Sequence, residues 1–385
     1  MGGRFLDGDG PDSRVPTIQL TRRQLLARGL QLGVGLPSAG WLLAACSKEA
    51  KAPAASPASS APPQISGTAV MSNYHEWIGE HEVDGFQALF PGTRIKQISA
   101  PTDSISSDVL FFKNHPGEYD FDLCDQSCMG QLLAANLLQE VDYDNIPNIQ
   151  YVEEPFRQSY NHGIPNDYGK VGIGYRKDIV TEGITSWADV WNLAPKYDGQ
   201  ITFLNLDRDC MGSALKYLGY SGNSTDEAEL EKCKETLLEI KPHLQALTNT
   251  NVANGLVKGT LAIAMDWDFD IALAQNKEPN VEWVVPSEGG VAYLEGWQAI
   301  VGTDSLDLVE AFMNFHLDPK NYADFVNTTG SAYIETAATS YIDKSIAENP
   351  ILFPDQEVLS RVEYEQYLGE ATALWSKVWD EFKSA

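Results

Sequence analysis

The sequence is short of positive charge. Its 385 residues hold 27 Lys and Arg against 54 Asp and Glu, a formal net charge of -27. Such a chain is repelled by nucleic acids and anionic membrane surfaces, which excludes proteins that bind them, and it attracts cations. An excess of carboxylates also serves solubility, and charge alone favours that interpretation. Global disorder is excluded too, because 43% of the residues are hydrophobic, enough for cores in about two domains.

Cysteine is scarce and lacks the spacing of a metal site. After Cys46 there are only Cys124, Cys128, Cys210 and Cys233. Four cysteines allow three disulfide pairings, and the sequence does not choose among them. Cys124 and Cys128 are four residues apart, but a zinc site needs a second close pair or nearby histidines. We therefore predict no metal site and no cofactor.

The usual catalytic motifs are also missing. The sequence has no Gly-rich phosphate loop, no Gly-x-Ser-x-Gly elbow and no His-Glu-x-x-His helix, which removes the signatures of several large enzyme classes. We predict a protein that is not an enzyme. The alternative from another class is a carboxylate-dependent enzyme, such as a glycosidase that uses two of the acids described below.

The amino terminus has the pattern of an export signal. Arg22 and Arg23 precede a modest apolar stretch that ends in Leu-Ala-Ala-Cys at Cys46. Paired arginines in this position resemble a twin-arginine signal, and the ending resembles a lipobox, whose cysteine is lipidated and becomes the first mature residue. Polar residues and a proline interrupt the apolar run, which disfavours a spanning helix of about 20 apolar residues.

These features define the first two segments of the chain. Residues 1–45 are predicted to be a signal peptide, and residues 46–66, rich in Ala, Pro and Ser, a flexible tether. Removal of residues 1–45, which hold five arginines and three aspartates, leaves a net charge of -29. We expect a protein outside the cytoplasm, anchored to the membrane by lipid, and no later segment is apolar enough to span a membrane.

From residue 68 onward, β-rich runs alternate with helical patterns, which favours an α/β fold with mostly parallel sheets. The predicted strands are Thr68–Asn73, Arg94–Ser99, Phe121–Asp125, Val171–Tyr175, Gln200–Leu204, Leu261–Asp266, Val281–Val285 and Gln298–Val301. The predicted helices are Gln131–Leu138, Ser213–Leu218, Asp226–Ile240, Leu306–His316, Tyr322–Thr328 and Gly369–Phe382.

Aromatic and acidic residues occur together near the ends of several predicted strands. Aromatic faces attract ammonium groups by about 0.5–2 kcal/mol each, and carboxylates give them charge-assisted hydrogen bonds. Ligands of open α/β domains bind beyond the carboxyl ends of strands. Together these segments fit an elongated organic cation. They are residues 74–77 (YHEW), 207–209 (DRD), 266–270 (DWDFD) and 293–297 (YLEGW).

Short motifs in the middle of the chain carry a family resemblance. They read TSWADVW at residues 185–191, YDG at 197–199, LGYSGN at 218–223 and PSEGG at 286–290. In this order they resemble the spermidine/putrescine-binding proteins, the solute receptors of bacterial polyamine ABC importers. The similarity runs from about Thr68 to the carboxyl terminus with few gaps.

The resemblance implies a two-lobed α/β fold of the periplasmic-binding-protein type (type II), with the ligand in a cleft between lobes that close on it. One lobe is then expected over residues 67–174 and 291–335, and the other over 175–290 and 336–385. The implied function is the extracytoplasmic solute-binding component of an ABC importer that binds a putrescine- or spermidine-like polyamine. The implied partners are this cation and the permease subunits, with no nucleic acid and with the protein a monomer.

The resemblance also assigns ligand-binding residues position by position. Several of the family's aromatic positions hold other residues here, so the resemblance does not identify the amine. Another organic cation or a sugar is an alternative solute. A signalling receptor that does not take part in transport is an alternative role. The candidate residues are the aromatics Tyr74, Trp77, Trp267 and Tyr293, the acids Asp209, Asp270, Glu295 and Glu365, and Ser127.

Overall fold

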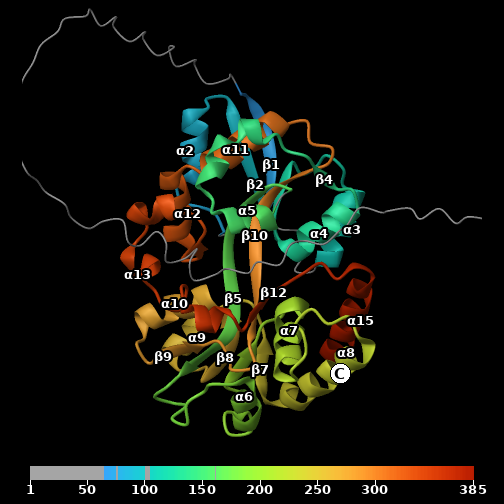
Figure 1. The fold of residues 1–385 in the computed structure, drawn as a ribbon, viewed down its shortest axis with the longest axis vertical. Helices are drawn as coiled ribbons and strands as arrows, with labels where there is room; N and C mark the ends of the chain where they lie inside the picture. Colours follow the sequence, from blue (N-terminus) through green and yellow to red (C-terminus); the bar gives the residue numbers. More distant parts are fainter. Residues whose placement is uncertain (1–64, 75–76, 100–104, 161) are drawn as a thin grey trace, which may run out of the picture.

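The computed structural model describes residues 65–74, 77–99, 105–160 and 162–385 (Figure 1). Arg22, Arg23 and Cys46, with the predicted signal peptide and residues 46–64 of the tether, lie outside the described residues. In the described part, no helix combines the length and apolar character needed to cross a membrane.

The strands and helices alternate along the chain, as predicted. The strands are β1 (Gly67–Asn73), β2 (Thr93–Ser99), β3 (Phe121–Asp125), β4 (Leu138–Gln139), β5 (Ile164–Arg176), β6 (Ile201–Phe203), β7 (Leu244–Leu247), β8 (Ile263–Trp267), β9 (Val281–Val284), β10 (Gly290–Ile300), β11 (Ala332–Tyr333) and β12 (Val362–Tyr364). The α-helices are α2 (Glu82–Leu89), α3 (Ile105–Asn114), α4 (Gln126–Ala134), α5 (Glu154–Ser159), α6 (Trp187–Leu193), α7 (Asp207–Tyr217), α8 (Glu227–Ile240), α9 (Val252–Lys258), α10 (Asp268–Lys277), α11 (Leu306–His316), α12 (Pro319–Thr329), α13 (Lys344–Ala347), α14 (Gln356–Leu359) and α15 (Thr372–Ser384). Short 3-10 helices are η1 (Tyr143–Asn145), η2 (Pro147–Tyr151), η3 (Lys241–His243), η4 (Thr336–Tyr341) and η5 (Gly369–Ala371).

Two long strands, β5 and β10, join two lobes (Figure 1). The sheet order is β2-β1-β3-β10-β5-β8-β6-β7. Residues 164–170 of β5 pair with β10, whereas residues 171–176 pair with β8 and β9. The amino-terminal lobe is built on β1, β2 and β3, and the second lobe on β6, β7, β8 and β9. Side chains on β5 and β10 therefore stand where the two lobes meet.

The sheet is mixed rather than mostly parallel. Strands β1, β2 and β3 pair in parallel, and so do β6, β7 and β8. Strands β5 and β10 run antiparallel to each other, and each also runs antiparallel to its lobe neighbours β8 and β3. The α/β prediction is confirmed, but the prediction of mostly parallel pairing fails at the two strands that the lobes share.

Local sequence explains where several helices begin. Ser186 and Asp189 form a capping box at the start of α6, which satisfies two backbone N–H groups. Asp226 caps α8 by accepting from the N–H groups of Ala228 and Glu229, as its Ser-Thr-Asp sequence predicts. The predicted helix Gln131–Leu138 is misplaced, because the helix begins at Gln126, capped by Asp125, and ends at Ala134.

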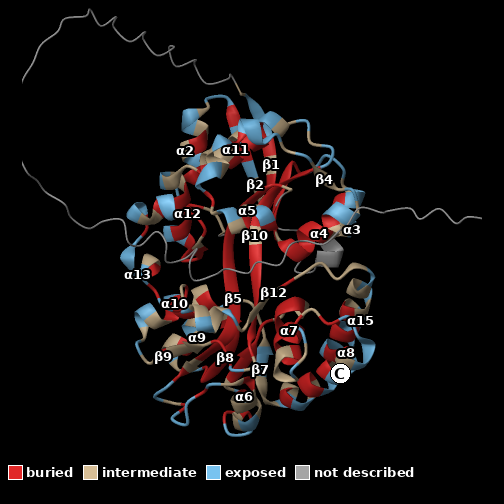
Figure 2. Ribbon diagram, in the orientation of Figure 1, coloured by how far each residue is buried: buried red, intermediate tan, exposed pale blue. Residues whose placement is uncertain are grey.

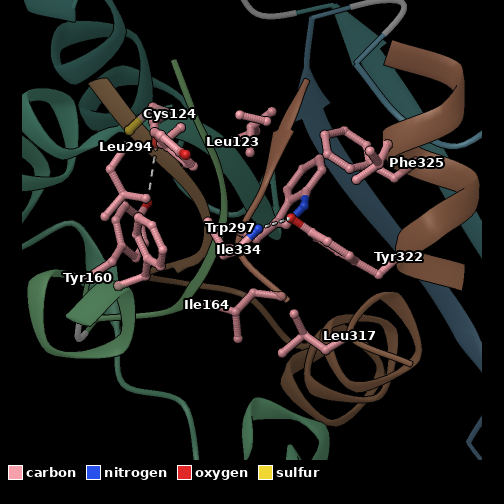
Figure 3. Close-up of a cluster of buried hydrophobic side chains, with 14 of the residues drawn as sticks. Leu123, Cys124, Tyr160, Ile164, Leu294, Trp297, Leu317, Tyr322, Phe325 and Ile334 are labelled. Carbon is pink, nitrogen blue, oxygen red and sulfur yellow. Dashed lines mark hydrogen bonds between the residues drawn. The ribbon is translucent and has the colours of Figure 1, made fainter. Parts of the chain in front are cut away.

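Buried side chains fill both lobes, and β5 and β10 are buried along most of their length (Figure 2). In one core cluster Trp297 packs against Phe121 and Phe312 at ring centroid distances of 5.4 and 6.4 Å. Figure 3 shows Trp297 in this cluster, with Tyr322 and Phe325 on one side and Tyr160 on the other. The other cluster includes Trp187, Phe203, Leu237, Trp375 and Phe382.

Candidate functional site

Three carboxylates stand side by side across three neighbouring strands where the lobes meet. In the antiparallel register, Glu295 of β10 lies opposite Asp125 of β3 on one side and Asp167 of β5 on the other. Directly opposed residues share a face of the sheet, with Cβ atoms about 4.5–5.5 Å apart, and like charges in this position are destabilising. We call Asp125, Glu295 and Asp167 the acid row.

A β-bulge shapes one end of the acid row. The register between β5 and β10 shifts at Glu295 and Gly296, so that Asn166 is the extra residue. Bulges re-aim side chains and are common beside functional sites. The Asn166 side-chain amide donates to Asp167 Oδ1 at 2.8 Å, while Asp167 Oδ2 is buried without a hydrogen-bond partner.

Aromatic rings lie beside the acid row. Trp77 donates its indole N–H to Asp167 Oδ1 at 3.3 Å, and its ring contacts Phe269 of α10 at a centroid distance of 4.8 Å. Trp267 stacks on the same Phe269 at 5.7 Å with ring planes 13° apart. Tyr293 covers Gly169, where a Cβ atom would stand 2.2 Å from the Tyr293 hydroxyl. Glycine at this position lets the tyrosine lie flat against the strand.

A fourth carboxylate comes from the second lobe. Asp209, 5% exposed, lies in the first turn of α7, and the nearby Trp267 side chain partly offsets the rise in its pKa. The charge of Asp125 raises the pKa of Asp209, and the charge of Asp209 raises the pKa of Glu295. Asp209 therefore faces the acid row from the other lobe.

Two buried cations in this region, Lys170 and Arg208, each pair with another acid, although the charge of Arg208 also lowers the pKa of Asp125 and Asp209. Lys170 Nζ lies 2.5 Å from Asp268 Oδ2, and both side chains are 1% exposed. Arg208 Nε lies 3.7 Å from Glu365 Oε2, and the Arg208 guanidinium stands 4.4 Å from the Trp375 ring centroid. Among the described residues, no lysine, arginine or histidine forms an ion pair with the acid row or with Asp209.

The unpaired acids have raised pKa values. Burial raises the pKa of Asp167 to about 7, although hydrogen bonds from Trp77 and Asn166 lower it. Burial and the neighbouring Asp125 raise the pKa of Asp209 to about 7. Burial and the charges of Asp167 and Asp125 raise the pKa of Glu295 well above its usual range. Since a bound cation favours the charged form of an acid, binding would lower these pKa values and displace protons from the groups.

Asp270 belongs to a separate acid pair. It lies four residues after Asp266 of β8, whose side chain acts on it electrostatically, and burial raises the Asp270 pKa to about 6. Asp266 is fully buried and is coupled electrostatically to Asp270 and then to Asp209. The pair thus adjoins Asp209, whereas the groups that shift the Asp270 pKa include no member of the acid row.

The remaining predicted residues, Tyr74, Ser127 and Glu365, lie near the acid row and differ in their exposure to solvent. Tyr74 follows β1 and is 45% exposed; partial burial and the charges of Glu295 and Asp125 raise the pKa of its hydroxyl. Ser127 is buried, and its backbone N–H donates to Asp125 Oδ1 at 2.6 Å. Glu365 is buried beside Arg208 rather than in the acid row.

Sequence reasoning missed two of the three acids in the row. Asp125 ends a correctly predicted strand, and that position was a usable signal. Asp167 gave no signal, because the strand was predicted to begin only at Val171 and pairing of β5 with β10 is not encoded locally. Lys170, Asp268 and Phe269 were likewise missed, although the last two lie in a segment noted for its aromatic and acidic residues.

Comparison with known proteins gives a consistent result. Residues 86–354 match the family model described as bacterial extracellular solute-binding protein. The chain is 25% identical over 299 residues to the spermidine/putrescine-binding periplasmic protein of Salmonella typhimurium, covering 76% of this chain and 85% of that one. It is 24% identical over 329 residues to the putrescine/cadaverine-binding protein of Pseudomonas aeruginosa, covering 81% and 92%.

Solved structures share the fold. The Tp0655 (TpPotD) lipoprotein of Treponema pallidum matches with a TM-score of 0.72 at 20% identity, covering 82% of this chain and 99% of that one. These matches confirm the two-lobed fold and the family resemblance of the sequence motifs.

Proposed function

The chain belongs to the family of bacterial extracellular solute-binding proteins, and from this premise we propose that it is the solute-binding component of an ABC importer for a polyamine such as putrescine, cadaverine or spermidine. The acid row is the main evidence that the ligand is a cation. Three carboxylates in adjacent strand positions repel one another unless protons or a cation compensate them. Relatives named for putrescine, cadaverine and spermidine support a cation of this kind.

We assign complementary roles to the acids and the rings. The acid row holds one ammonium group through charge-assisted hydrogen bonds, and Asp209 in the facing lobe holds a second. Trp77, Trp267 and Tyr293 cover the methylene chain between them, since aromatic faces attract both methylenes and the ammonium charge. Tyr74 closes the exposed side.

Three of the candidate residues act around these contacts in this proposal. Ser127 positions Asp125 through its backbone N–H. Glu365 pairs with Arg208 at 3.7 Å, so that the guanidinium offsets the charge of Asp209 only in part. Asp270 acts on Asp266, which is in turn coupled to Asp209, so the pair adds negative potential near Asp209.

Lobe closure and docking follow from the same proposal. Trp77 of the amino-terminal lobe contacts Phe269 of the second lobe, which supports a closed arrangement that the permease subunits recognise. We place the lobe boundaries at residues 67–174 with 291–335 and 175–290 with 336–385. The protein acts as a monomer and performs no catalysis.

Export and anchoring complete the proposal. Arg22 and Arg23 direct the chain to the twin-arginine route, and Cys46 carries the lipid anchor that holds the protein outside the cytoplasm. Lysine replacement of both arginines blocks export in a cell-fractionation assay, and Cys46→Ala yields a protein released from membranes. Export of the double lysine variant at the normal level would contradict the assigned route.

Calorimetric titration tests the ligand class. The purified protein is titrated with putrescine, cadaverine and spermidine at low ionic strength, with a neutral sugar as the control solute. We expect one molecule of at least one amine to bind and the sugar not to bind. Binding of the sugar with no response to any of the amines would refute the proposed function.

A further inference from the structure

A second set of donor atoms lies beneath the acid row. One carboxylate oxygen of Asp122 and the sulfur atoms of Cys124 and Cys128 all lie within 4.8 Å of one another. All three residues are buried, the two cysteines at 4% and 1% exposure. We call Asp122, Cys124 and Cys128 the thiol cluster.

The local fold brings these three side chains together. Asp122 and Cys124 are two residues apart on β3, so their side chains share one face of the strand. Asp125 then caps α4, which turns the chain back so that Cys128 in the first helical turn meets Cys124. The spacing of Cys124 and Cys128 does not predict this arrangement, because the third donor, Asp122, joins them only when residues 122 and 124 share one face of a strand.

A fourth polar group reaches the thiol cluster from β10. Gln298 lies opposite Asp122 in the strand register, and its side-chain NH2 group donates to Cys124 Sγ at 2.8 Å and to Asp122 Oδ2 at 3.3 Å. Its Oε1 accepts a hydrogen bond from the Tyr160 hydroxyl. Figure 3 shows Tyr160 beside Cys124.

Tyr160 can hold the Gln298 amide in either orientation. A hydroxyl has one proton, and the Gly296 carbonyl oxygen lies 2.9 Å from it, closer than the Cys124 carbonyl oxygen at 3.3 Å. If the amide is reversed and the Tyr160 proton goes to Gly296, the Tyr160 oxygen accepts from the Gln298 NH2 group and Oε1 faces the thiol cluster. The amide oxygen would then join the two sulfurs and the carboxylate oxygen, which lie within 4.8 Å of one another.

We propose that the thiol cluster binds one thiophilic divalent cation, for which Zn²⁺ is the probe, with Gln298 Oε1 as the fourth contact. Zn²⁺ prefers four ligands drawn from sulfur, nitrogen and carboxylate oxygen, and sulfur donors select it over Mg²⁺ and Ca²⁺. Binding replaces the two thiol protons, which pass to solvent, and no atom changes its oxidation state.

The thiol cluster is connected directly to the acid row. Asp125, a member of the acid row, lies between the two cysteines in the sequence and accepts from the backbone N–H of Cys128. A bound ion would therefore fix the strand end that presents Asp125.

The other two cysteines supply a matched control. Cys233 Sγ contacts the Met211 carbonyl oxygen at 3.5 Å, and burial followed by the nearby Cys233 raises the Cys210 pKa. Both are buried in the core cluster around Trp187 and Trp375. Among the described residues they do not join a carboxylate or histidine in a group of close donor atoms.

The experiment measures ion binding directly and does not depend on any amine. Because the donors are buried, the reduced protein is refolded with equimolar Zn²⁺ or Co²⁺, desalted, and its metal content determined. We expect one ion per chain, a thiolate-to-Co²⁺ charge-transfer band, and a melting temperature above that of the metal-free protein. Cys128→Ser should lose the band and the ion, whereas Cys233→Ser should keep both.

Three outcomes would overturn the proposal. One is a folded, reduced protein that retains no ion; another is an ion and a band that survive Cys128→Ser. The third is a Cys124–Cys128 disulfide in protein isolated from its host, detected by mass spectrometry of alkylated peptides. Circular dichroism of the Cys128→Ser protein separates loss of the ligand from loss of the fold.

Discussion

Glu363, on a strand that pairs with β10, and Glu295, on β10 itself, differ in the groups that surround their carboxylates. Glu363 of β12 lies opposite Val291 of β10, and its carboxylate accepts from Ser221, Gly222 and Asn223 and pairs with Lys216 at 3.3 Å. Although burial raises the Glu363 pKa, these hydrogen bonds lower it below its usual value.

Glu295, four positions further along β10 than Val291, has the opposite surroundings. Asp125 and Asp167 flank it, and burial together with their charges raises its pKa. The contrast teaches that the fold can satisfy an acid fully, as it does for Glu363. In the acid row only Asp125, which caps α4, has a structural role of this kind, so placing Glu295 between Asp125 and Asp167 reflects a requirement other than stability. Acids with a cationic partner or hydrogen-bond donors stabilise the fold, whereas the acids without a cationic partner are the ones we propose to bind a cation.

The largest expected effect comes from breaking a paired acid. Lys170→Met leaves Asp268 buried without its cation, and we expect the free energy of unfolding to fall by about 3–5 kcal/mol. Urea denaturation measures this. The double variant Lys170→Met/Asp268→Asn removes both charges and should recover most of the loss; equal instability of the single and double variants would show that the charge pair is not the cause.

Removing an unpaired acid should affect binding instead. Glu295→Gln is expected to weaken polyamine binding about 30- to 1000-fold, about 2–4 kcal/mol, because it removes a charge that contacts the ammonium group. Glu363→Gln is the matched control and should change the affinity less than about threefold. Similar losses in the two variants, measured by calorimetry, would remove the distinction between the two kinds of acid.

The acid row should also cost stability in the empty protein. We expect Asp167→Asn to raise the free energy of unfolding at pH 8 by about 1–3 kcal/mol, because ionised Asp167 is buried beside like charges. Denaturation without amine, compared with wild type, measures the change. A destabilised Asp167→Asn protein at this pH would mean that the Trp77 and Asn166 hydrogen bonds outweigh the repulsion.

The raised pKa values set a pH dependence with a definite sign. Asp167 titrates near 7 in the folded chain and near 4 unfolded, so the folded state holds more protons between these values. Stability of the empty protein should then fall as pH rises from about 4 to 7, by up to about 1.4 kcal/mol per pH unit for each such group. Amine affinity should rise over the upper part of this range, because binding expels these protons.

Calorimetry at pH 5.5 and 7.5 in two buffers of different ionisation enthalpy counts the protons released. Glu295→Gln and Asp167→Asn should each reduce that count. Release of no protons by the wild type would show that the acid row is already ionised when empty.

The smallest expected effect concerns the aromatic neighbour of the row. Trp77→Phe keeps a ring against Phe269 but removes the indole N–H that donates to Asp167. We expect amine affinity to fall about three- to tenfold, because this hydrogen bond is long at 3.3 Å and a typical hydrogen bond contributes about 1 kcal/mol. An unchanged affinity would assign Trp77 a packing role only.

The sequence predicted the fold class well because local patterns encode it. Phe121–Asp125 and Leu306–His316 have the bounds that alternation and helical periodicity predict. The family motifs placed Trp77, Asp209, Trp267, Tyr293 and Glu295 in one region, and the structure brings them together. These residues lie at strand or helix ends or within motifs, where short-range signals are strongest.

What the sequence did not reveal depends on pairing between distant segments. Asp125, Glu295 and Asp167 come from three strands spread over 171 positions of the chain, and only the register of β10 aligns them. The same applies to Lys170 and Asp268, whose ion pair forms between β5 and the start of α10. Local propensity carries no information about register across a sheet.

The contact between Trp77 and Phe269 provides an optical signal that needs no label. Trp77 follows β1 in one lobe, and Phe269 opens α10 in the other, so lobe separation must part the rings and let water reach the indole. Tryptophan emission is sensitive to such a change of surroundings. The difference between wild-type and Trp77→Phe emission therefore isolates one of the nine tryptophans, and its time course after mixing with an amine would give the rate at which the lobes close.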